Sequence, residues 1–482
     1  MNPLLLTDGY KVDHRRQYPT GTTLVYSNWT PRKSRIENVD EVVFFGLQYF
    51  IKKYIIHDFE AYFFKQPKEE VFKKYARRIN NYLGENQVGT KHLEDLHDLG
   101  YIPMVFKALP EGSSVPVRVP MFTMYNTKPE FFWLTNYFET LLSAVIWLPC
   151  NSATIARQYR IILDSFAHKT SSIPDFVNWQ GHDFSMRGMG GIEAAVTSAA
   201  GHLLSFTGTD TIPAIDFLEE YYNANSDTEL IGGSVAATEH SVMCMGTTEG
   251  EFETFQRLIS EVYPKGIVSI VSDTWDLWKV LTNYLPRLKE QISSREGKVV
   301  VRPDSGDPIL ILCGNPDGKT EEEKKGVVEL LWDVFGGTTN SKGYKELIPQ
   351  IGAIYGDSIT LERATKICEN LKEKGFASTN VVLGIGSFTY QYNTRDTFGF
   401  AMKATYGEVN GVGREIFKDP VTDDGTKKSA KGLMKIVSEN NTFKLIDQVS
   451  WDEEKQGELK EVFRDGKLLV DASLAKIRAR VK

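Results

Sequence analysis

Short runs of β-branched residues that end in an Asp or Gly cluster recur through the middle of this chain. Four of them are GIVSIVSD at 266–273, KVVVRPDSG at 298–306, IGAIYGDS at 351–358 and NVVLGIGS at 380–387. Each pattern predicts a buried strand with a polar C-terminal end. Between two of them, Leu361, Ala364, Ile367, Cys368 and Leu371 form one helical stripe before Gly375. Strands that alternate with helices predict βαβ units and parallel strands.

Two architectures place polar residues at the C-terminal ends of parallel strands. One is an α/β barrel and the other is an open doubly wound sheet, and sequence periodicity does not separate them. The chain lacks a GxGxxG that opens a helix after a first strand with an acid about 20 residues later, which weakens the dinucleotide-binding version. We therefore expect a barrel.

The two ends of the chain have a different pattern. Residues 1–175 are rich in aromatic and mixed patterns, with a predicted helix at 69–83, and the tail carries alternating runs at 441–447 and 460–470 that predict antiparallel strands. The expected fold class is thus α/β, an atypical barrel over 178–396. Segments 1–177 and 397–482 together are expected to form a second, β-rich α+β domain.

The charge balance limits the classes of partner. Lys and Arg number 56 against 63 Asp and Glu, a net charge of −7, which argues against nucleic acid or an anionic membrane as a partner. The four cysteines are scattered without a CxxC pair, which is typical of a reduced cytosolic protein. The N-terminal apolar run is short and the apolar segment 141–150 is interrupted by Pro149, so we expect a cytoplasmic protein without a membrane span.

The predicted strand ends supply a convergent polar set. Its members are His182, Asp183, Phe184, Arg187, Asp210, Glu239, His240, Asp273, Asp276, Arg302, Asp304 and Asp357. Carboxylates accept hydrogen bonds from sugar hydroxyls and hold hydrated Mg²⁺, while arginine forks bind phosphate oxygens. The set therefore suits a polyhydroxylated, phosphorylated substrate. The alternative is that each Asp caps the helix that follows its strand.

Three further features add to this interpretation. The glycines in LGIGSF at 383–388 predict either an anion-binding nest or a tight turn. A local group of basic residues follows, which would bind anions or form a solvated face: Arg395, Lys403, Lys418, Lys427, Lys428 and Lys431. His240 would act as a nucleophile or acid/base if Asp276 orients it, and would otherwise be a hydrogen-bonded core residue.

Ordered motifs along nearly the whole chain resemble those of the nicotinamide phosphoribosyltransferases. They include TDGYKVDH at 7–14, HDFSMRG at 182–188, FTGTDT at 206–211, GGSVAATEHS at 232–241, VSDTWD at 271–276 and RPDSG at 302–306. The resemblance implies that nicotinamide and phosphoribosyl pyrophosphate react to give nicotinamide mononucleotide and pyrophosphate, the salvage step toward NAD. It also implies an atypical α/β barrel with a β-rich second domain, and a homodimer with both active sites at the subunit interface.

The resemblance assigns the ring-binding residues by matching motif. Phe184 and the partner subunit's Tyr10 would sandwich the pyridine ring by offset stacking. Asp210 would accept the carboxamide N–H and repel nicotinate, by about 1 to 4 kcal/mol at 4 Å. The other substrate-binding residues would be Asp8, Ser234 and Ser272.

The remaining roles follow from the same motifs. Arg187 would hold the base and the 5′-phosphate, Gly386 and Ser387 the phosphate, and Arg302, Asp304, Gly356 and Asp357 the ribose and reacting centre. Pyrophosphate would be bound by Arg32, Arg395, Lys403 and Lys427, with Mg²⁺ held through the substrate phosphates and not directly assigned to protein ligands. His240, oriented by Asp276, would take the γ-phosphoryl of ATP, a coupled co-substrate. The catalytic set would be His240, Asp276, Asp304 and Arg302.

Some residues depart from the family pattern. Ser387 and Phe388 replace glycines of the phosphate loop, and Ala401 stands where relatives have a phosphate-contacting serine. Three alternatives stay open: a nicotinate phosphoribosyltransferase, a catalytically silent dimeric interaction protein on the same scaffold, and an aldolase-like lyase. The last would need a strand-end lysine for a Schiff base, and the quoted strand ends carry none.

Overall fold

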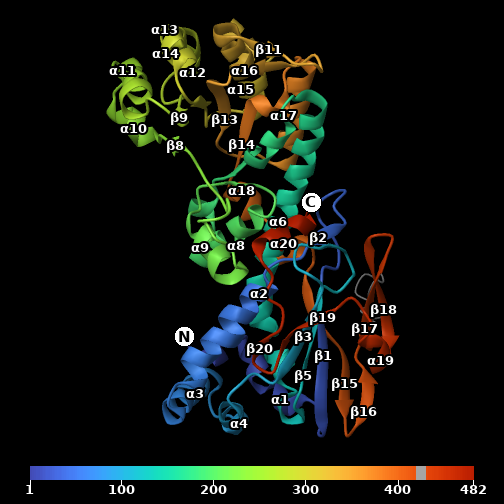
Figure 1. Ribbon diagram of the computed structural model, residues 1–482. Helices are drawn as coiled ribbons and strands as arrows, with labels where there is room; N and C mark the ends of the chain where they lie inside the picture. Colours follow the sequence, from blue (N-terminus) through green and yellow to red (C-terminus); the bar gives the residue numbers. More distant parts are fainter. Residues whose placement is uncertain (419–429, 482) are drawn as a thin grey trace. The chain divides into compact units, whose positions relative to one another are not determined.

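The central strands form one parallel sheet in the computed structural model, which describes residues 1–418 and 430–481. The chain divides into two units. The barrel unit comprises residues 155–216 and 225–392, and the antiparallel unit comprises residues 1–154, 217–224 and 393–482. Both units are drawn in Figure 1.

Seven strands build the sheet of the barrel unit, in the order β7-β6-β14-β13-β10-β9-β8. Their bounds are β6 (Gly181–Asp183), β7 (Gly208–Thr209), β8 (Ala236–Ala237), β9 (Val268–Val271), β10 (Val299–Arg302), β13 (Ile351–Tyr355) and β14 (Val381–Ile385). All neighbouring strands in this order are parallel. The predicted parallel sheet is therefore confirmed.

The two edges of this sheet are joined. A parallel bridge pairs Gly208 of β7 with Gly233, which lies just before β8. The Thr209 N–H donates to the Gly233 carbonyl and the Gly233 N–H to the Thr207 carbonyl, at 3.0 and 2.8 Å. The sheet thus curls on itself, which confirms the expected atypical barrel over the open doubly wound alternative.

Helices connect successive strands of the barrel unit and surround the curled sheet (Figure 1). The main ones are α7 (Val177–Gln180), α8 (Ile192–His202), α10 (His240–Met245), α11 (Glu251–Arg257), α12 (Leu277–Lys279), α13 (Leu285–Arg287), α14 (Lys289–Ser294), α15 (Pro308–Cys313), α16 (Glu321–Phe335), α17 (Leu361–Glu373) and α18 (Ser387–Tyr390). The predicted stripe at 361–371 buries Ala364, Ile367, Cys368 and Leu371. A hairpin of β11 (Gly337–Thr339) and β12 (Lys345–Leu347) adds to this unit.

The antiparallel unit is built from both ends of the chain. Its main sheet has the order β16-β15-β1-β5-β3-β19-β20. The strands are β1 (Thr22–Thr30), β3 (Met104–Ala108), β5 (Phe122–Asn126), β15 (Ala401–Val409), β16 (Val412–Glu415), β19 (Lys460–Arg464) and β20 (Lys467–Leu468). Because β1 pairs with β15 and β3 with β19, the N- and C-terminal segments share one sheet, as the sequence predicts.

Two smaller antiparallel pairs and several helices complete this unit. The pairs are β2 (Glu41–Val43) with β4 (Ser114–Pro116), and β17 (Leu433–Glu439) with β18 (Thr442–Val449). The helices are α1 (His14–Gln17), α2 (Leu47–Phe50), α3 (Lys68–Leu83), α4 (Lys91–Leu99), α5 (Leu134–Tyr137), α19 (Trp451–Glu454) and α20 (Leu474–Val481). The fully buried Trp29 stacks on Phe400 with ring centroids 5.3 Å apart. Both ends of the chain therefore contribute side chains to the core of this unit.

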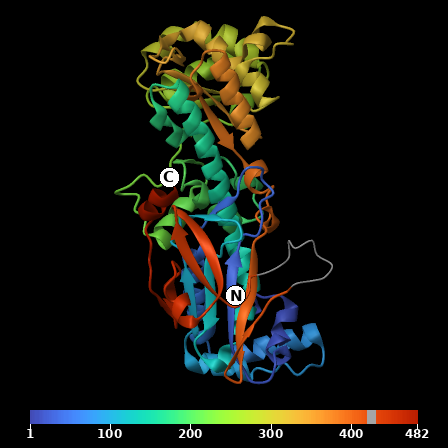
Figure 2. The same ribbon diagram turned by 90° about the vertical axis from the view of Figure 1, so that its right-hand side faces the viewer.

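The longest helix among the described residues is α6 (Glu139–Thr170), which is drawn as one long ribbon in Figure 2, and Pro149 lies inside it. The expected interruption there is wrong, because a proline inside a helix removes one hydrogen bond and this helix has many others to retain it. In the part of the chain that the structure describes, no single helix has the length and hydropathy to cross a membrane, and only the bent pair Pro129–Tyr137 and Glu139–Thr170 meets that criterion jointly.

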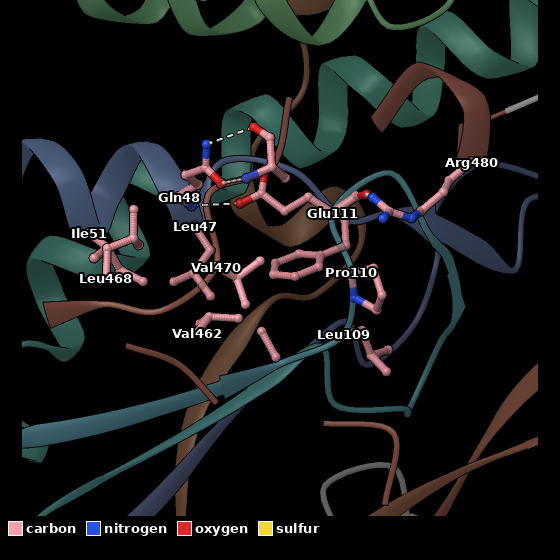
Figure 3. A pocket seen from close by; sticks show the side chains of 13 residues that line it. Leu47, Gln48, Ile51, Leu109, Pro110, Glu111, Val462, Leu468, Val470 and Arg480 are labelled. Carbon is pink, nitrogen blue, oxygen red and sulfur yellow. Dashed lines mark hydrogen bonds between the residues drawn. The ribbon is translucent and has the colours of Figure 1, made fainter. Parts of the chain in front are cut away.

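A buried carboxyl stabilises one junction of the antiparallel unit. Glu111 accepts hydrogen bonds from the backbone N–H groups of Gly46 and Gln48 and from the Tyr222 hydroxyl. Figure 3 shows it beside a small apolar cavity of about 60 Å³, whose wall includes Leu47 and Val470. Burial raises the pKa of the Glu111 carboxyl, although these three donors favour its ionised form.

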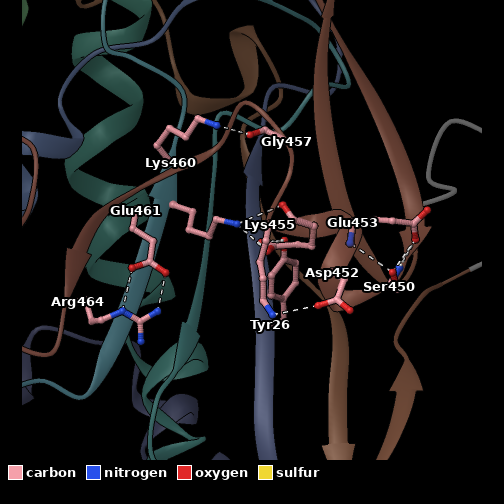
Figure 4. Close-up of polar contacts among 11 residues, drawn as sticks. Tyr26, Ser450, Asp452, Glu453, Lys455, Gly457, Lys460, Glu461 and Arg464 are labelled. Carbon is pink, nitrogen blue, oxygen red and sulfur yellow. Dashed lines mark hydrogen bonds and ion pairs between the residues drawn. The ribbon is translucent and has the colours of Figure 1, made fainter.

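The start of α19 contains a second polar cluster of the antiparallel unit. Ser450 and Glu453 form a capping box there (Figure 4). On β19, Arg464 donates a 2.9 Å hydrogen bond to Glu461, which the same figure shows. Lys107 on β3 forms a buried ion pair with Glu454 at 2.6 Å. Breaking either member of that pair would leave an uncompensated buried charge, so it fixes α19 against the sheet.

A buried histidine links three elements of the barrel unit. His202, at the end of α8, accepts a hydrogen bond at Nδ1 from the Tyr390 hydroxyl of α18, at 2.7 Å. Its Nε2 donates to the carbonyl of Gly208 in β7, at 3.1 Å. Burial, reinforced by nearby His182, lowers the pKa of His202 from 6.5 to about 4 although Asp183 opposes the shift. The ring is therefore neutral at physiological pH.

Acidification should destabilise the barrel unit through His202. In the unfolded chain this histidine titrates near 6.5, so its contribution is fully present above that pH and is lost as the pH falls toward about 4. The difference between the two pKa values corresponds to about 3 kcal/mol of folding free energy. Melting temperatures of the unmodified protein and of His202→Gln, measured from pH 7.5 to 4.5, should fall less steeply for the variant. Parallel curves for the two proteins would contradict this assignment.

Candidate functional site

Strand register brings three loops of the barrel unit to one level. Asp183, the last residue of β6, pairs with Ile385 of β14 on one side and with Thr209 of β7 on the other. The residues that follow these three are Phe184, Gly386 and Asp210. Parallel strands end at the same edge of a sheet, so these residues begin the rim of a common site.

A cavity of about 780 Å³ lies at this C-terminal edge. Eleven of the residues predicted from the sequence line it: Phe184, Arg187, Asp210, Glu239, His240, Arg302, Asp304, Gly356, Asp357, Gly386 and Ser387. Met186, Gly188, Ala237 and Thr238 complete the wall. The strand-end pattern thus converges on one concave site with both cationic and anionic groups.

Asp210 is the best-defined carboxylate of this cavity. Its Oδ1 accepts a hydrogen bond from His182 Nε2 at 2.8 Å and from the Ser234 hydroxyl at 2.6 Å. Burial alone would raise the pKa of the carboxyl, but these two donors outweigh it and hold the pKa below the usual range. The carboxylate is therefore ionised at neutral pH, with Oδ1 bound by two donors.

An aromatic ring contacts the histidine that donates to this carboxylate. The rings of Phe184 and His182 have centroids 4.4 Å apart, tilted by 40°. Gly384 permits this placement, because a Cβ there would lie 2.8 Å from the Phe184 ring. Phe184, His182 and Ser234 also line a second cavity of about 380 Å³, whose other lining residues include Val300 and Val382. The site therefore joins an apolar pocket to a hydrogen-bonding carboxylate.

Asp304 lies beside Arg302 and close to two further carboxylates. The Arg302 Nε is 3.6 Å from Asp304 Oδ2, and its guanidinium donates to the Thr238 carbonyl at 2.7 Å. The Asp304 N–H donates to Asp273 Oδ2 at 2.9 Å. Burial raises the pKa of the Asp304 carboxyl, and the negative charges of Asp273 and Asp357 add to it, against the opposing effect of Arg302. Gly356 allows the close approach, because a Cβ there would lie 2.2 Å from Asp304 Oδ1.

His240, the first residue of α10, faces a different aspartate from the one expected. Its Nε2 is 3.6 Å from Asp273 Oδ1. Asp276 instead caps α12, accepting the Lys279 N–H at 3.1 Å. The orienting role assigned to Asp276 stays a prediction, while the geometry favours Asp273, the aspartate that comes first after β9.

The loop after β14 begins α18 at Ser387. Gly386 and Ser387 both line the large cavity, and Phe388 stacks on the exposed Tyr392 with centroids 5.6 Å apart. The two residues that replace family glycines therefore have different surroundings. Ser387 keeps a small polar side chain at the cavity, while the larger Phe388 ring packs on a neighbour.

Basic residues of the antiparallel unit gather around Lys403 on β15. Burial lowers the pKa of Lys403, and the charges of Arg32, Lys418 and Arg395 lower it further, against the opposing effect of Glu139. Arg32 is held by a 2.9 Å hydrogen bond from Nε to the Gly399 carbonyl. A lysine with several cationic neighbours is suited to a ligand that carries several negative charges. The predicted Lys427 lies outside the described residues, and Ala401 is a buried residue of β15.

The antiparallel unit also has a polar cavity of about 260 Å³. Asp8, Tyr10 and Arg395 line it, together with Glu139, Thr140, Ser143, Ala144 and Trp147. The Thr140 hydroxyl donates to Asp8 Oδ2 at 2.7 Å. Three residues predicted from separate ends of the chain thus share one surface.

Two members of the predicted strand-end set make contacts that the sequence analysis did not assign, and one predicted residue has a local role. His182 and Asp273 were recognised only as strand-end residues, although one donates to Asp210 and the other lies beside His240. Their signal is the position directly at a strand end. Ser272, predicted to bind substrate, is fully buried and donates to the Ile270 carbonyl at 2.7 Å.

Comparison with known proteins agrees with this arrangement. A family model described as the nicotinate phosphoribosyltransferase (NAPRTase) family matches residues 179–467, and a nicotinamide phosphoribosyltransferase N-terminal domain matches residues 2–92. A nicotinamide phosphoribosyltransferase of Acinetobacter baylyi is 55% identical, covering 100% of this chain and 97% of the relative. One from Mycoplasma pneumoniae is 36% identical, covering 89% and 94%.

Solved structures share the fold. The nicotinate-nucleotide pyrophosphorylase of Pyrococcus furiosus has a TM-score of 0.57 at 14% identity, covering 98% of this chain and 93% of its own. Human nicotinic acid phosphoribosyltransferase has a TM-score of 0.53 at 15% identity, covering 99% and 93%. With the full-length sequence matches, these likenesses show that the chain belongs to the nicotinate and nicotinamide phosphoribosyltransferase family.

Proposed function

We propose that this protein transfers the phosphoribosyl group of phosphoribosyl pyrophosphate to nicotinamide, giving nicotinamide mononucleotide and pyrophosphate in NAD salvage. The observation that carries the proposal is Asp210, an ionised carboxylate that lines the same cavity as the Phe184 ring. Its Oδ1 already accepts two protein donors, so Oδ2 would accept the N–H of a carboxamide. The name shared by the full-length relatives supports the same base.

The pocket recognises a flat, uncharged ring. The face of Phe184 would stack on the pyridine, an interaction worth about 0.5 to 1.5 kcal/mol beyond burial. Nicotinate would place its own carboxylate next to that of Asp210, and the two charges would repel. Among the two bases, nicotinamide is therefore the better substrate.

The charged groups around Arg302 would act on the ribose. The bond between the anomeric carbon and pyrophosphate breaks, the pair of electrons leaves with pyrophosphate, and the pyridine nitrogen forms the new bond. The ribosyl ring is positively charged in between, so the carboxylates of Asp304 and Asp357 favour the transition state over the ground state. Arg302, Arg187 and the backbone at Gly386 and Ser387 would bind hydroxyl and phosphate oxygens.

The donor set is compatible with Mg²⁺ bound mainly through substrate. Asp273 Oδ1 and Asp304 Oδ1 are buried oxygens without a hydrogen-bond partner among the described residues. No group of three or more metal-ligating side chains occurs in the described chain. Mg²⁺ often uses one or two carboxylates plus phosphate oxygens, and these aspartates would provide them. When bound, it supplies positive charge to the departing pyrophosphate.

A homodimer would complete the ring pocket, the part of the site formed by Phe184 and Asp210. Tyr10 is 62% exposed although it is a large aromatic residue, and Tyr392 and Met245 are 80% and 85% exposed. Exposed aromatic and apolar groups favour an interface between protein copies. In the dimer, the partner subunit's Tyr10 would form the second face of the ring pocket. The cations around Lys403 would bind the pyrophosphate.

We further propose that ATP hydrolysis is coupled to the synthesis through His240. Nε2 of His240 lies toward Asp273, which would stabilise the charged ring, so Nδ1 stays available to attack the γ-phosphorus of ATP. ADP leaves with the electron pair, and phosphohistidine forms until water hydrolyses it.

Replacing His240 with alanine should abolish this coupling. With γ-labelled ATP, the variant should retain no acid-labile label, and ATP should no longer raise the rate of mononucleotide synthesis. Asp273→Asn should lower the labelling at least fivefold. The matched substitution Asp276→Asn, at a helix cap, separates the two candidate partners: labelling like that of the unmodified protein is expected if Asp273 orients His240, and a loss of labelling would assign the role to Asp276. Undiminished labelling or ATP stimulation in His240→Ala would contradict the assignment.

Synthesis of the mononucleotide from nicotinamide as the only base tests the proposed reaction. Purified protein with nicotinamide, phosphoribosyl pyrophosphate and Mg²⁺ should form the mononucleotide, detected by mass, and chelation with EDTA should stop it. A catalytically silent interaction protein would form none. That alternative has little physical support, because buried carboxylate oxygens without partners cost folding energy and would serve no purpose in a protein that only binds.

A further inference from the structure

Asp183 is a fully buried carboxylate with four protein donors. Its Oδ1 accepts the backbone N–H of Ser185 at 3.0 Å and the Ser185 hydroxyl at 2.6 Å. Its Oδ2 accepts the hydroxyls of Thr209 and Thr211, at 2.8 and 2.7 Å. These four hydrogen bonds offset the cost of burying the carboxylate, and they restrict the conformation of the loops that they reach.

These four bonds reach the two loops that form the ring pocket. Ser185 directly follows Phe184, and the two threonines lie on either side of Asp210. The Thr209 hydroxyl oxygen also accepts the Thr211 N–H, at 3.0 Å. The Asp210 N–H donates to the Asp183 carbonyl, also at 3.0 Å. The backbone of Asp210 is therefore fixed before, at and after the residue.

We propose that Asp183 is a positioning residue that sets the discrimination between the two pyridine bases. It does not line the catalytic cavity, and it acts by holding the Asp210 carboxylate in the cavity that the Phe184 ring also lines. This inference rests on the proposed function. Its physical basis is that a misplacement of about 1 Å in a positioning group can cost a hundredfold in rate.

Thr211 offers the sharpest test, because one substitution removes its hydroxyl and another keeps it. Thr211→Val preserves shape and loses the bond to Asp183, while Thr211→Ser retains the bond. The valine variant should raise KM for nicotinamide about tenfold while kcat changes less than threefold. Its ratio of kcat/KM for nicotinamide over nicotinate should fall at least fivefold. The serine variant should restore the ratio to within about twofold of the unmodified protein, and Asp183→Asn should shift it as valine does.

Thr197→Val is the matched control. Thr197 is equally buried in the barrel unit, but its hydroxyl donates to the Glu193 carbonyl within α8. This variant should lower the melting temperature without changing the base ratio. Unchanged ratios in Thr211→Val and Asp183→Asn, whatever their melting temperatures, would overturn the positioning role. If the unmodified protein made no mononucleotide from nicotinamide, the proposed function would fail and take this inference with it.

Discussion

Replacing Asp210 with asparagine should reduce the preference for nicotinamide over nicotinate by about two orders of magnitude. The amide keeps an oxygen that can accept from His182 and Ser234, so the local hydrogen bonds survive. The negative charge is lost, and with it a repulsion on nicotinate of about 1 to 4 kcal/mol at 4 Å. The new amide group also presents N–H donors to a carboxylate. Steady-state kcat/KM for each base, measured on both proteins, gives the ratio.

Asp216→Asn is the control for the charge change. This exposed residue lies six positions along the chain, in the first turn of a helix, and away from the cavity lining. It should leave the base ratio within twofold. A ratio for Asp210→Asn that equals that of the unmodified protein would show that another group reads the amide.

Replacing Asp304 with asparagine should lower kcat by about 10² to 10³-fold. Removal of one preorganised group that stabilises transition-state charge typically has an effect of this size. Because burial and the neighbouring aspartates raise the pKa of Asp304, its ionised form is present above a pKa higher than the usual 3.8 and is lost as the pH falls through it. The acid limb of the kcat profile should therefore lie above that value in the unmodified protein and disappear in the variant.

Asp307→Asn makes the same chemical change three residues away. Asp307 is an exposed helix cap that accepts the Ile309 N–H, and because asparagine caps a helix about as well as aspartate, the variant should keep nearly the stability of the unmodified protein. Its kcat and acid limb should match those of the unmodified protein. A residual kcat in Asp304→Asn above one tenth of normal, or a retained acid limb, would remove Asp304 from the catalytic set.

Local pattern was enough to predict the strand ends. A β-branched run followed by Asp or Gly indicates where a parallel strand stops, and that edge carries the site. The charged residues that line the large cavity were therefore predictable from their places at the strand ends, whereas Met186, Gly188, Ala237 and Thr238 were not predicted. The bridge between Gly208 and Gly233, which joins the two edges of the sheet, was not predictable, because it depends on the curvature of all seven strands.

The contacts between particular side chains could be assigned only from the three-dimensional structure. Asp273 and Asp276 both follow β9, and sequence cannot tell which one caps α12 and which one faces His240. The contact of His182 with Asp210 depends on the register between β6 and β7. Neither pairing has a signature in linear spacing, since helix caps and site carboxylates use the same residue types.

The most direct test of the central claim is a competition between the two bases in one tube. Equal concentrations of isotopically labelled nicotinamide and unlabelled nicotinate, with limiting phosphoribosyl pyrophosphate and Mg²⁺, would be followed by mass spectrometry of both mononucleotides. We expect nicotinamide mononucleotide to exceed the nicotinate product at least tenfold. Equal amounts of the two products, or an excess of the nicotinate product, would contradict the role of the Asp210 carboxylate and the proposed function with it.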